Sequence, residues 1–465
     1  MKENFEDHSE ELELIHRFEQ MLGNKETVFF DLTDFEFIID HYTANFEYTK
    51  ALAACDSAIA QYPFSTELQI DKAQLLAMSG SFEEAMSMID KVAEVEPANP
   101  DVQLTRGIIY TQRGDYRDAI DHFKKAMAYD EERDDIYFNI GLTYQSWGKF
   151  NSAIKYYKKC ISLNVENEAA MQEIVYCMEL TGTLQEHLPF FQEFVDTDPY
   201  SYVAWFNLGN VLNKTGAYDK AIAAYEYATL IKPDFITAYN NMANAYVFLS
   251  EYTKAIESFN AMLEHGEPSA EVYCNIGECY EKLLQWDLSR RYYQKSVDLD
   301  PEMDEAWFGI GVILDAQNKW HEAVHFFKKA VELYDDSPEY WVALAAAEYQ
   351  VGHVVSALES YERAAEIQPN DKNVYLNWSI ILFEQGNFED ATNIILNAIE
   401  LQPDEAELYY RACAYMLSAG KYREAYNYLE NALVLNFDKH KLLFEFFPEL
   451  ESQRALSRLI DQYRK

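Results

Sequence analysis

Apolar residues along this chain recur three and four positions apart over short stretches, as in "WFNLGNVL" (205–212) and "AIAAYEYATLI" (221–231). This spacing places the apolar side chains on one face of an α-helix. Glycine commonly separates the two runs of such a pair, and proline follows the second. The pattern therefore predicts an all-α protein made of short helices joined in pairs by tight turns.

The helical pattern repeats with a period of 34 residues. Steps of 34 from Ala51 reach alanine at ten of twelve positions, and the register does not slip. The twelve positions are Ala51, Ala85, Ala119, Ala153, His187, Ala221, Ala255, Ser289, Ala323, Ala357, Ala391 and Ala425. Twelve units then occupy residues 32–439. A fixed period of this length indicates a stack of helix pairs, because one pair alone cannot bury its apolar faces.

Three other places recur in phase with the alanine. A small residue precedes it by twelve positions, and an aromatic precedes the small residue by four (Tyr137, Trp205 and Trp307 are examples). Small residues let paired helices approach closely, and the bulky aromatic is expected to fill the gap to the next pair. Eight units carry glycine five positions before the alanine, where a helix end needs positive φ. These glycines are Gly80, Gly114, Gly148, Gly182, Gly216, Gly352, Gly386 and Gly420.

The combined signature resembles the tetratricopeptide repeat, most clearly in "AWFNLGNVLNKTGAYDKAIAAYEYATLIKP" (204–233). The resemblance implies a right-handed α-solenoid superhelix of antiparallel helix pairs, with the first helix of each pair lining a concave groove. Residues 1–31 and 440–465 lie outside the phase and are expected to form capping helices. The unit 168–201 is the weakest, because His187 replaces the alanine, and we expect a bend or a sub-array junction there.

Composition limits the kinds of partner and the cellular compartment that we expect. The formal charge of −41 disfavours nucleic acid and anionic membrane surfaces as partners. The N-terminal stretch lacks the apolar core of a secretory signal, and no apolar run is long enough to span a membrane. The six cysteines are scattered without a C-x-x-C pair, which is typical of reduced, buried thiols. We therefore expect a cytoplasmic protein.

One motif suggests chemistry: "WHEAVHFFKKA" (320–330) contains H-E-x-x-H, the helical zinc motif of metallopeptidases. Ala323 in its centre is the repeat alanine, so His321 and His325 fall at polar places of the second helix. Glu348 lies at a plausible distance for a third ligand, but it belongs to the first helix of the next unit. A metal-dependent hydrolase is thus the alternative hypothesis, whereas the main prediction includes no catalytic residue, metal or cofactor.

The groove is predicted from the place two residues after the aromatic, which faces inward in the repeats that this chain resembles. Asparagine recurs there, and its amide can bond to the backbone of an extended peptide. The predicted groove residues are Asn139, Phe206, Asn207, Asn210, Asn240, Asn241, Asn244, Asn275, Glu278, Phe308 and Asn377. Glutamates near the same wall favour a protein or peptide partner with Lys or Arg.

Three other interpretations stay open. The asparagines could bond to neighbouring helices instead of a peptide. The groove could stay empty in a purely structural subunit. A carboxylate clamp for chaperone tails would use Asn210 and Asn241, but its basic places hold Phe206, Glu271 and Asn275. The main prediction is a non-enzymatic interaction scaffold of unknown oligomeric state.

Overall fold

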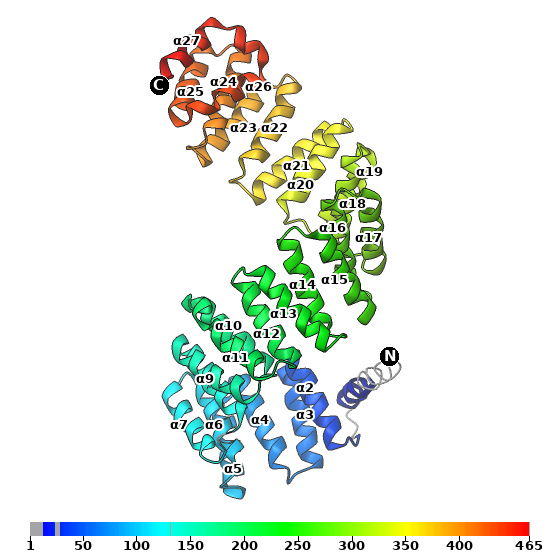
Figure 1. Cartoon of the computed structure of the whole chain (residues 1–465), viewed down its shortest axis with the longest axis vertical. Helices are drawn as coiled ribbons and strands as arrows, with labels where there is room; N and C mark the ends of the chain where they lie inside the picture. The colour runs from blue at the N-terminus through cyan, green and yellow to red at the C-terminus, as the bar shows by residue number, and fades with distance from the viewer. Residues whose placement is uncertain (1–12, 24–27, 131, 465) are drawn as a thin grey trace. The chain divides into compact units, whose positions relative to one another are not determined.

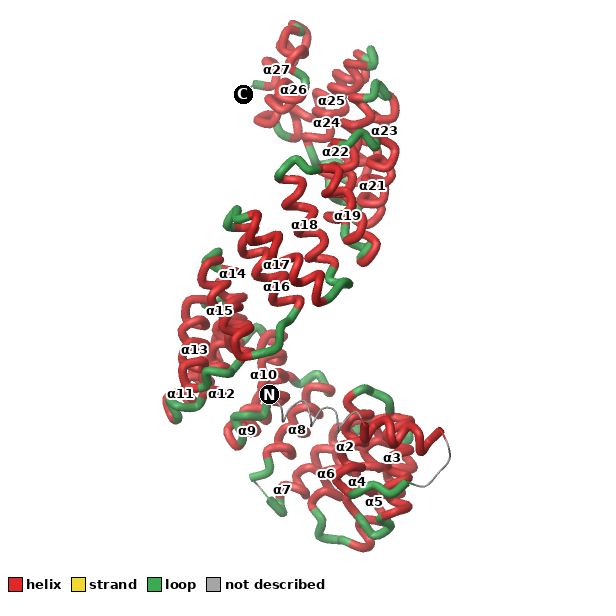
Figure 2. Tube along the Cα trace, turned by 90° about the vertical axis from the view of Figure 1, so that its right-hand side faces the viewer, coloured by secondary structure: helices red, strands yellow, loops and turns green. Residues whose placement is uncertain are grey.

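The computed structural model describes residues 13–23, 28–130 and 132–464, and these residues form helices and turns without a strand (Figure 2). The chain divides into two compact units, Met1–Pro233 and Asp234–Lys465. Within each unit, helices that follow one another in the chain lie side by side (Figure 1). The fold class is the expected all-α solenoid of antiparallel helix pairs.

The first unit contains the helical residues 13–23 and six regular or modified pairs. Its elements are α2 (Leu32–Ala44), α3 (Tyr48–Gln61), α4 (Thr66–Met78), α5 (Phe82–Val95), α6 (Pro100–Arg113), α7 (Tyr116–Met127), α8 (Asp134–Ser146), α9 (Phe150–Leu163), α10 (Glu168–Thr181), η1 (Leu184–His187), α11 (Leu188–Thr197), α12 (Tyr202–Lys214) and α13 (Tyr218–Ile231).

The second unit contains six further pairs and a C-terminal cap. Its elements are α14 (Ile236–Phe248), α15 (Tyr252–His265), α16 (Ala270–Lys282), α17 (Trp286–Leu299), α18 (Asp304–Ala316), α19 (Trp320–Leu333), α20 (Pro338–Gln350), α21 (Val354–Ile367), α22 (Lys372–Glu384), α23 (Phe388–Leu401), α24 (Ala406–Ser418), α25 (Tyr422–Leu435), η2 (Phe437–His440), α26 (Lys441–Phe446), η3 (Pro448–Ser452) and α27 (Arg454–Tyr463).

The turn inside each pair has a left-handed residue at the predicted place. All eight glycines that the sequence marks there have φ between 66° and 89°. The four units without glycine place Phe46, Ser250, Leu284 and Asn318 at the same position, with φ of 58° or 59°. A side chain in this conformation costs free energy, so these four turns are strained relative to the others.

The repeat alanine lies in the core, and every one of the ten is fully buried. The small residue of the first helix faces an aromatic ring of the second helix. A Cβ added to Gly141 would lie 2.4 Å from the Tyr157 ring, and one added to Gly277 would lie 2.8 Å from Tyr293. The second helix therefore supplies the ring that packs against the small residue.

The first-helix aromatic, which the sequence predicts as a filler between pairs, also ties the array to the preceding turn. Trp205 and Trp307 donate their indole N–H groups to the carbonyls of Pro199 and Pro301, at 2.9 and 3.0 Å. Trp341 does the same to Asp335. Each ring thus fixes the turn that connects two consecutive pairs.

Both ends of the array are closed by short helices. Residues 13–23 bury Ile15, Phe18 and Met21 against the first pair, whereas residues 1–12 and 24–27 of the predicted segment lie outside the described part. At the other end, the predicted helix over 449–465 begins only at Arg454, because the preceding residues form η3 and bury Leu450.

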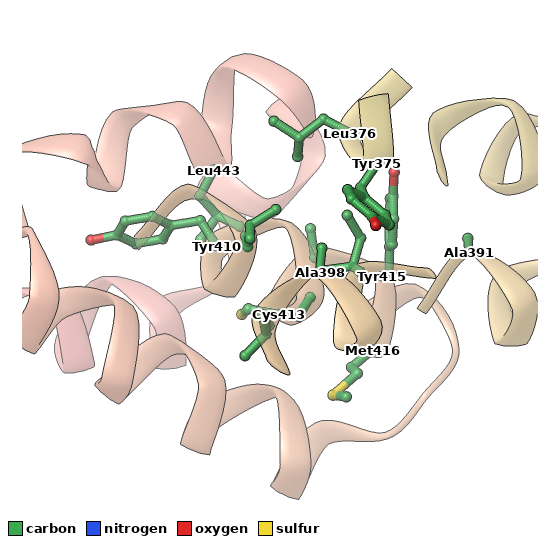
Figure 3. Packing of buried hydrophobic residues seen from close by; sticks show 14 of the residues in the cluster. Tyr375, Leu376, Ala391, Ala398, Tyr410, Cys413, Tyr415, Met416 and Leu443 are labelled. Carbon is green, nitrogen blue, oxygen red and sulfur yellow. The ribbon is translucent and has the colours of Figure 1, made fainter. Parts of the chain in front are cut away.

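The C-terminal cap makes α24 the most enclosed helix of the second unit. Figure 3 shows Tyr410, Cys413, Tyr415 and Met416 of this helix packed among residues of the neighbouring helices, with Leu443 of α26 on one side. A stack of helix pairs needs such a cover, since its last pair would otherwise expose an apolar face.

The unit 168–201 departs from the pattern as the sequence indicates. Its second helix is replaced by a 3-10 turn, η1, followed by the short helix α11. Leu184 still stands where other second helices begin, and His187 is half-exposed instead of buried. This irregular unit lies within the first compact unit, whose end at Pro233 comes later in the chain. A sub-array junction at 168–201 stays a prediction.

Candidate peptide-binding walls

First helices α4, α6 and α8 line a pocket of about 610 Å³ in the first unit. Its lining is mostly polar and includes Glu67, Asp71, Asp101, Arg133 and Asn139. We call this surface the first wall. All three helices that line it are the first helices of their pairs, and a binding groove along such helices stays a prediction.

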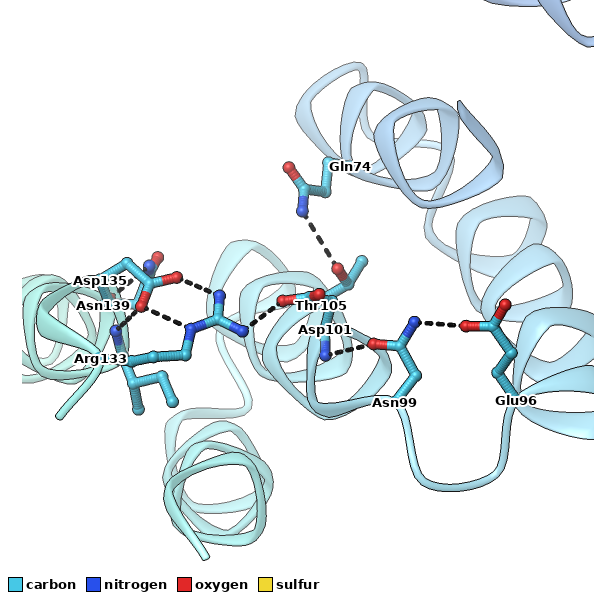
Figure 4. A network of polar contacts seen from close by, with 9 residues as sticks. Gln74, Glu96, Asn99, Asp101, Thr105, Arg133, Asp135 and Asn139 are labelled. Atoms are coloured by element: carbon cyan, nitrogen blue, oxygen red, sulfur yellow. Dashed lines mark hydrogen bonds and ion pairs between the residues drawn. The ribbon is translucent and has the colours of Figure 1, made fainter. Parts of the chain in front are cut away.

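A polar network holds one side of the first wall in place (Figure 4). Arg133 donates to Asp101 at 2.6 Å and to Asp135 at 3.0 Å. Asn139 donates its side-chain amide to the backbone carbonyl of Asp135, four residues earlier in its own helix. The cation of this pocket is therefore already paired with two carboxylates.

Asp71 has no such partner. The adjacent Lys72 turns to Asp56 instead, and among the described residues Asp71 makes no ion pair. Burial, followed by repulsion from the carboxylates of Glu67 and other acidic neighbours on α2, raises the pKa of Asp71 to about 6. The first wall thus offers a half-buried carboxylate that no cation of the described residues neutralises.

Asp71 occupies the same repeat place as the predicted asparagines. Steps of 34 from Asp71 reach Thr105, Asn139 and Glu173, which stand on α6, α8 and α10. Gln74 donates to the Thr105 hydroxyl at 3.1 Å. The position of Asp71 within the repeat could therefore have identified it from the sequence. The prediction missed this residue because it considered only asparagine at that position.

The second unit has an acidic surface on its first helices, which we call the second wall. It comprises Glu271, Glu278 and Glu281 of α16, and Asp304 and Glu305 of α18. Within the described residues, no ion pair neutralises any of these five carboxylates. Like charges therefore accumulate on adjacent helices of this unit.

Burial and this accumulation disfavour ionisation at two positions of the second wall. Burial raises the pKa of Glu281, with a smaller contribution from Glu278, and the Tyr293 hydroxyl opposes the shift by donating at 2.9 Å. Burial likewise raises the pKa of Glu305, and the carboxylates of Asp304 and Glu271 add to the shift. A bound Lys or Arg side chain would relieve both effects.

The predicted asparagines divide between the two units. In the first unit, Asn207 is only 8% exposed, and Asn210 accepts a hydrogen bond from the buried Tyr225 hydroxyl at 2.9 Å. The amide of Asn139 also serves its own helix. These contacts favour the structural interpretation for the first-unit asparagines, and their peptide-binding role stays a prediction.

In the second unit, the predicted residues are more accessible. Asn377 and Glu278 are exposed, whereas Asn240, Asn241, Asn244 and Asn275 are partly exposed. The two predicted aromatics pack inside the array. Phe206 contacts the Tyr225 ring in the first unit, and Phe308 stacks on Tyr340 in the second, with ring centroids 4.5 Å apart.

The H-E-x-x-H stretch lies on the outer side of α19. His321, Glu322 and His325 are exposed, and Ala323 is fully buried, as its phase predicts. Glu348 is 1% exposed and is bound to Lys328 at 2.9 Å and Ser360 at 3.0 Å, so it is not directed at the two histidines as a ligand. The described residues contain no group of three potential ligands that could hold a metal ion.

The cysteines lie in buried surroundings that are typical of structural residues. All six are buried free thiols, as the sequence predicts. Burial raises the pKa of Cys55, Cys274 and Cys413 to about 12, which keeps these thiols protonated at neutral pH.

None of the described helices combines the length and the apolarity that crossing a bilayer requires.

Family models match most of the array. Models described as tetratricopeptide repeat match residues 42–107, 134–167, 280–338, 313–372 and 349–414, and one described as TPR repeat matches 107–148 and 209–250. A PPR repeat model matches 237–267. The chain belongs to the tetratricopeptide repeat family, and its fold is an array of helix pairs.

Solved structures with related folds include YrrB, a TPR protein with an unusual peptide-binding site, at 24% identity over 40% of this chain and 96% of that one, with a TM-score of 0.35. Cut9 in the Cut9–Hcn1 hetero-tetramer of APC/C shares 14% identity over 82% and 89% of the two chains, with a TM-score of 0.39. Yeast Tom70 shares 15% identity over 87% and 99%, with a TM-score of 0.39. A search of curated proteins by sequence returns no significant match.

Proposed function

We propose that this protein is a non-enzymatic scaffold that binds an extended, Lys- or Arg-bearing segment of a partner protein on its first helices. The observation that carries the proposal is Asp71, a half-buried carboxylate that lines a pocket and forms no ion pair with any described residue. Leaving a charge desolvated and unpaired is unfavourable, so a cationic ligand side chain would gain from pairing with it.

The second wall supports the same partner chemistry independently. Its five carboxylates lie on two consecutive first helices and are not neutralised by ion pairs from the described chain. An extended segment with several basic residues would neutralise them one after another.

The six buried thiols fit a reducing compartment, and we propose that the protein acts in the cytoplasm.

Selection of a random peptide library on the full-length protein tests the proposal. Peptides enriched on the wild-type chain should contain excess Lys and Arg, and their binding should weaken with added salt. Asp71→Asn together with Glu67→Gln should reduce the affinity of peptides bound at the first wall by at least about tenfold. Asp121→Asn is the matched control, because Asp121 is an exposed carboxylate on α7.

Two outcomes would overturn the proposal. Selected peptides without a basic preference would show that the carboxylates do not choose the ligand. Equal affinities for the double variant, the control and the wild type, repeated with substitutions on the second wall, would show that these walls are not the binding surface.

A further inference from the structure

A second pocket, of about 790 Å³, lies in the first unit on the side formed by second helices. Residues of α7, α9 and η1 supply most of its lining, with Tyr137 from α8. The first wall, in contrast, is lined by α4, α6 and α8. The two pockets therefore share α8 but otherwise use different elements.

The lining of this pocket is basic although the chain is strongly acidic. Lys124, Lys155, Lys158 and Lys159 line it, and no Asp or Glu does. Three of these lysines lie on α9 at spacings of three and four residues, which places them on one helix face. We call these four residues and His187 the lysine pocket.

Two contacts hold Lys158 in position. Its ammonium donates to Nδ1 of His187 at 3.1 Å and lies 4.5 Å from the centre of the Phe190 ring. Both contacts depend on the irregular unit, because a regular unit would place a buried alanine where His187 stands. Burial lowers the pKa of Lys158 and of His187, so a nearby anion would be favourable for both.

The charge of the lysine pocket is not neutralised by ion pairs within the part of the chain that the structure describes. None of its four lysines forms an ion pair with any residue that the structure describes. By comparison, four other cations each form an ion pair with a carboxylate of the same compact unit: Lys72, Arg106, Arg133 and Lys372. Four unpaired cations around one pocket favour an anionic ligand.

The size and walls of the pocket specify the ligand further. Met127, Ile154 and Tyr156 provide apolar surface between the lysines. A single phosphate would leave most of the volume unfilled, whereas an apolar side chain flanked by carboxylates matches both kinds of lining. Glu186 and Glu193 lie close enough to His187 and Lys158 to shift their pKa values, so negative charge on a ligand is favoured inside the pocket and not beside these two carboxylates.

From this arrangement we infer that the lysine pocket binds an acidic segment of a protein partner, with an aliphatic or aromatic residue among its Asp and Glu side chains. The protein then has two surfaces of opposite charge preference. One chain could hold a basic segment on its first helices and an acidic segment on its second helices. This second activity does not depend on the first.

Fluorescence anisotropy with the full-length protein tests the inference. The probe is a short fluorescein-labelled peptide of Glu and Asp around one central Phe. We expect it to bind more tightly than the same peptide with Gln and Asn in place of the acids, and more tightly than the version with Ser in place of Phe. Lys155→Gln with Lys159→Gln should weaken binding about fivefold or more, since both side chains are exposed and their removal should not disturb the fold.

Matched controls separate the lysine pocket from general electrostatics. Lys125→Gln with Lys220→Gln removes the same charge from exposed positions outside the pocket and should leave affinity within about twofold. Asp71→Asn should leave this probe unaffected, so failure here is distinguishable from failure of the first-wall proposal. Equal losses for both lysine pairs, or no binding of the peptide, would overturn the inference.

Two further probes assign the anion class. A single-stranded oligodeoxythymidine of matched length and vesicles containing phosphatidylserine should each bind more weakly than the acidic peptide. Equal or tighter binding of either, sensitive to Lys155→Gln with Lys159→Gln, would overturn the peptide assignment in favour of nucleic acid or a membrane surface.

Discussion

Replacing Asp71 by asparagine should stabilise the protein while weakening its binding of basic peptides. The pKa of Asp71 rises from 3.8 to about 6 in the folded chain. Two pKa units correspond to about 3 kcal/mol of folding free energy. Because Asp71 is only half-buried, solvent screening reduces the expected effect to about 1–2 kcal/mol. Asp71→Asn removes this cost and keeps the size of the side chain.

The pH dependence follows from which state holds the proton. The unfolded chain loses the Asp71 proton near pH 4, whereas the folded chain keeps it until about pH 6. Stability therefore falls as pH rises through that window and stays low above it. The advantage of Asp71→Asn should be largest near pH 8 and should shrink to roughly half at pH 5.

Urea unfolding followed by circular dichroism measures the total difference, and hydrogen exchange of the α4 amides locates it. Both should be run above the sequence pI of 4.5, where the protein keeps its charge. Asp121→Asn serves as the control and should change stability little at any pH. A variant at Asp71 that is less stable than the wild type at pH 8, or equally stable at every pH, would refute the reasoning.

Three further predictions concern the array itself. Leu284→Gly should raise stability by about 0.5–1 kcal/mol in urea unfolding, since φ is 58° there and the side chain is 68% exposed; a loss would show that the turn is not strained. Gly277→Ala should cost about 1–3 kcal/mol by crowding the Tyr293 ring, and combining it with Tyr293→Leu should recover part of the loss in a double-mutant cycle. The fragment 234–465 should be soluble and helical by circular dichroism, whereas one beginning at α15 should aggregate, because it leaves α15 without its paired helix; equal behaviour would contradict the pairing.

Repetition explains why so much of the fold was predictable. First helices from α4 to α24 begin every 34 residues, as the alanine register implies, and the turn residues fall at the marked place even where glycine is missing. The same local packing problem recurs in each unit and has the same solution. The position of a residue such as Ala323 within the repeat therefore predicts its structural role.

What the sequence did not predict depends on interactions between units. The division after Pro233 follows from the packing of many helices and has no local marker. The raised pKa of Asp71 depends first on its burial in the array and then on acidic neighbours, two of which lie on α2. The lysine pocket depends on how η1 places His187 beside α9. Hydrophobic spacing records which face of a helix is buried, but it does not record which charges of different helices meet.

The unbroken register has a consequence for how the length of this protein can change. Consecutive regular pairs meet through equivalent positions, so a block of 34 residues can be duplicated or deleted with its new neighbours still matched. Such a change would lengthen or shorten a binding wall by one helix pair without requiring a new kind of contact between pairs. The pair that contains η1 is the exception, because its neighbours are fitted to a different turn. Recombination between repeats should therefore be tolerated on either side of residues 168–201 and selected against within them.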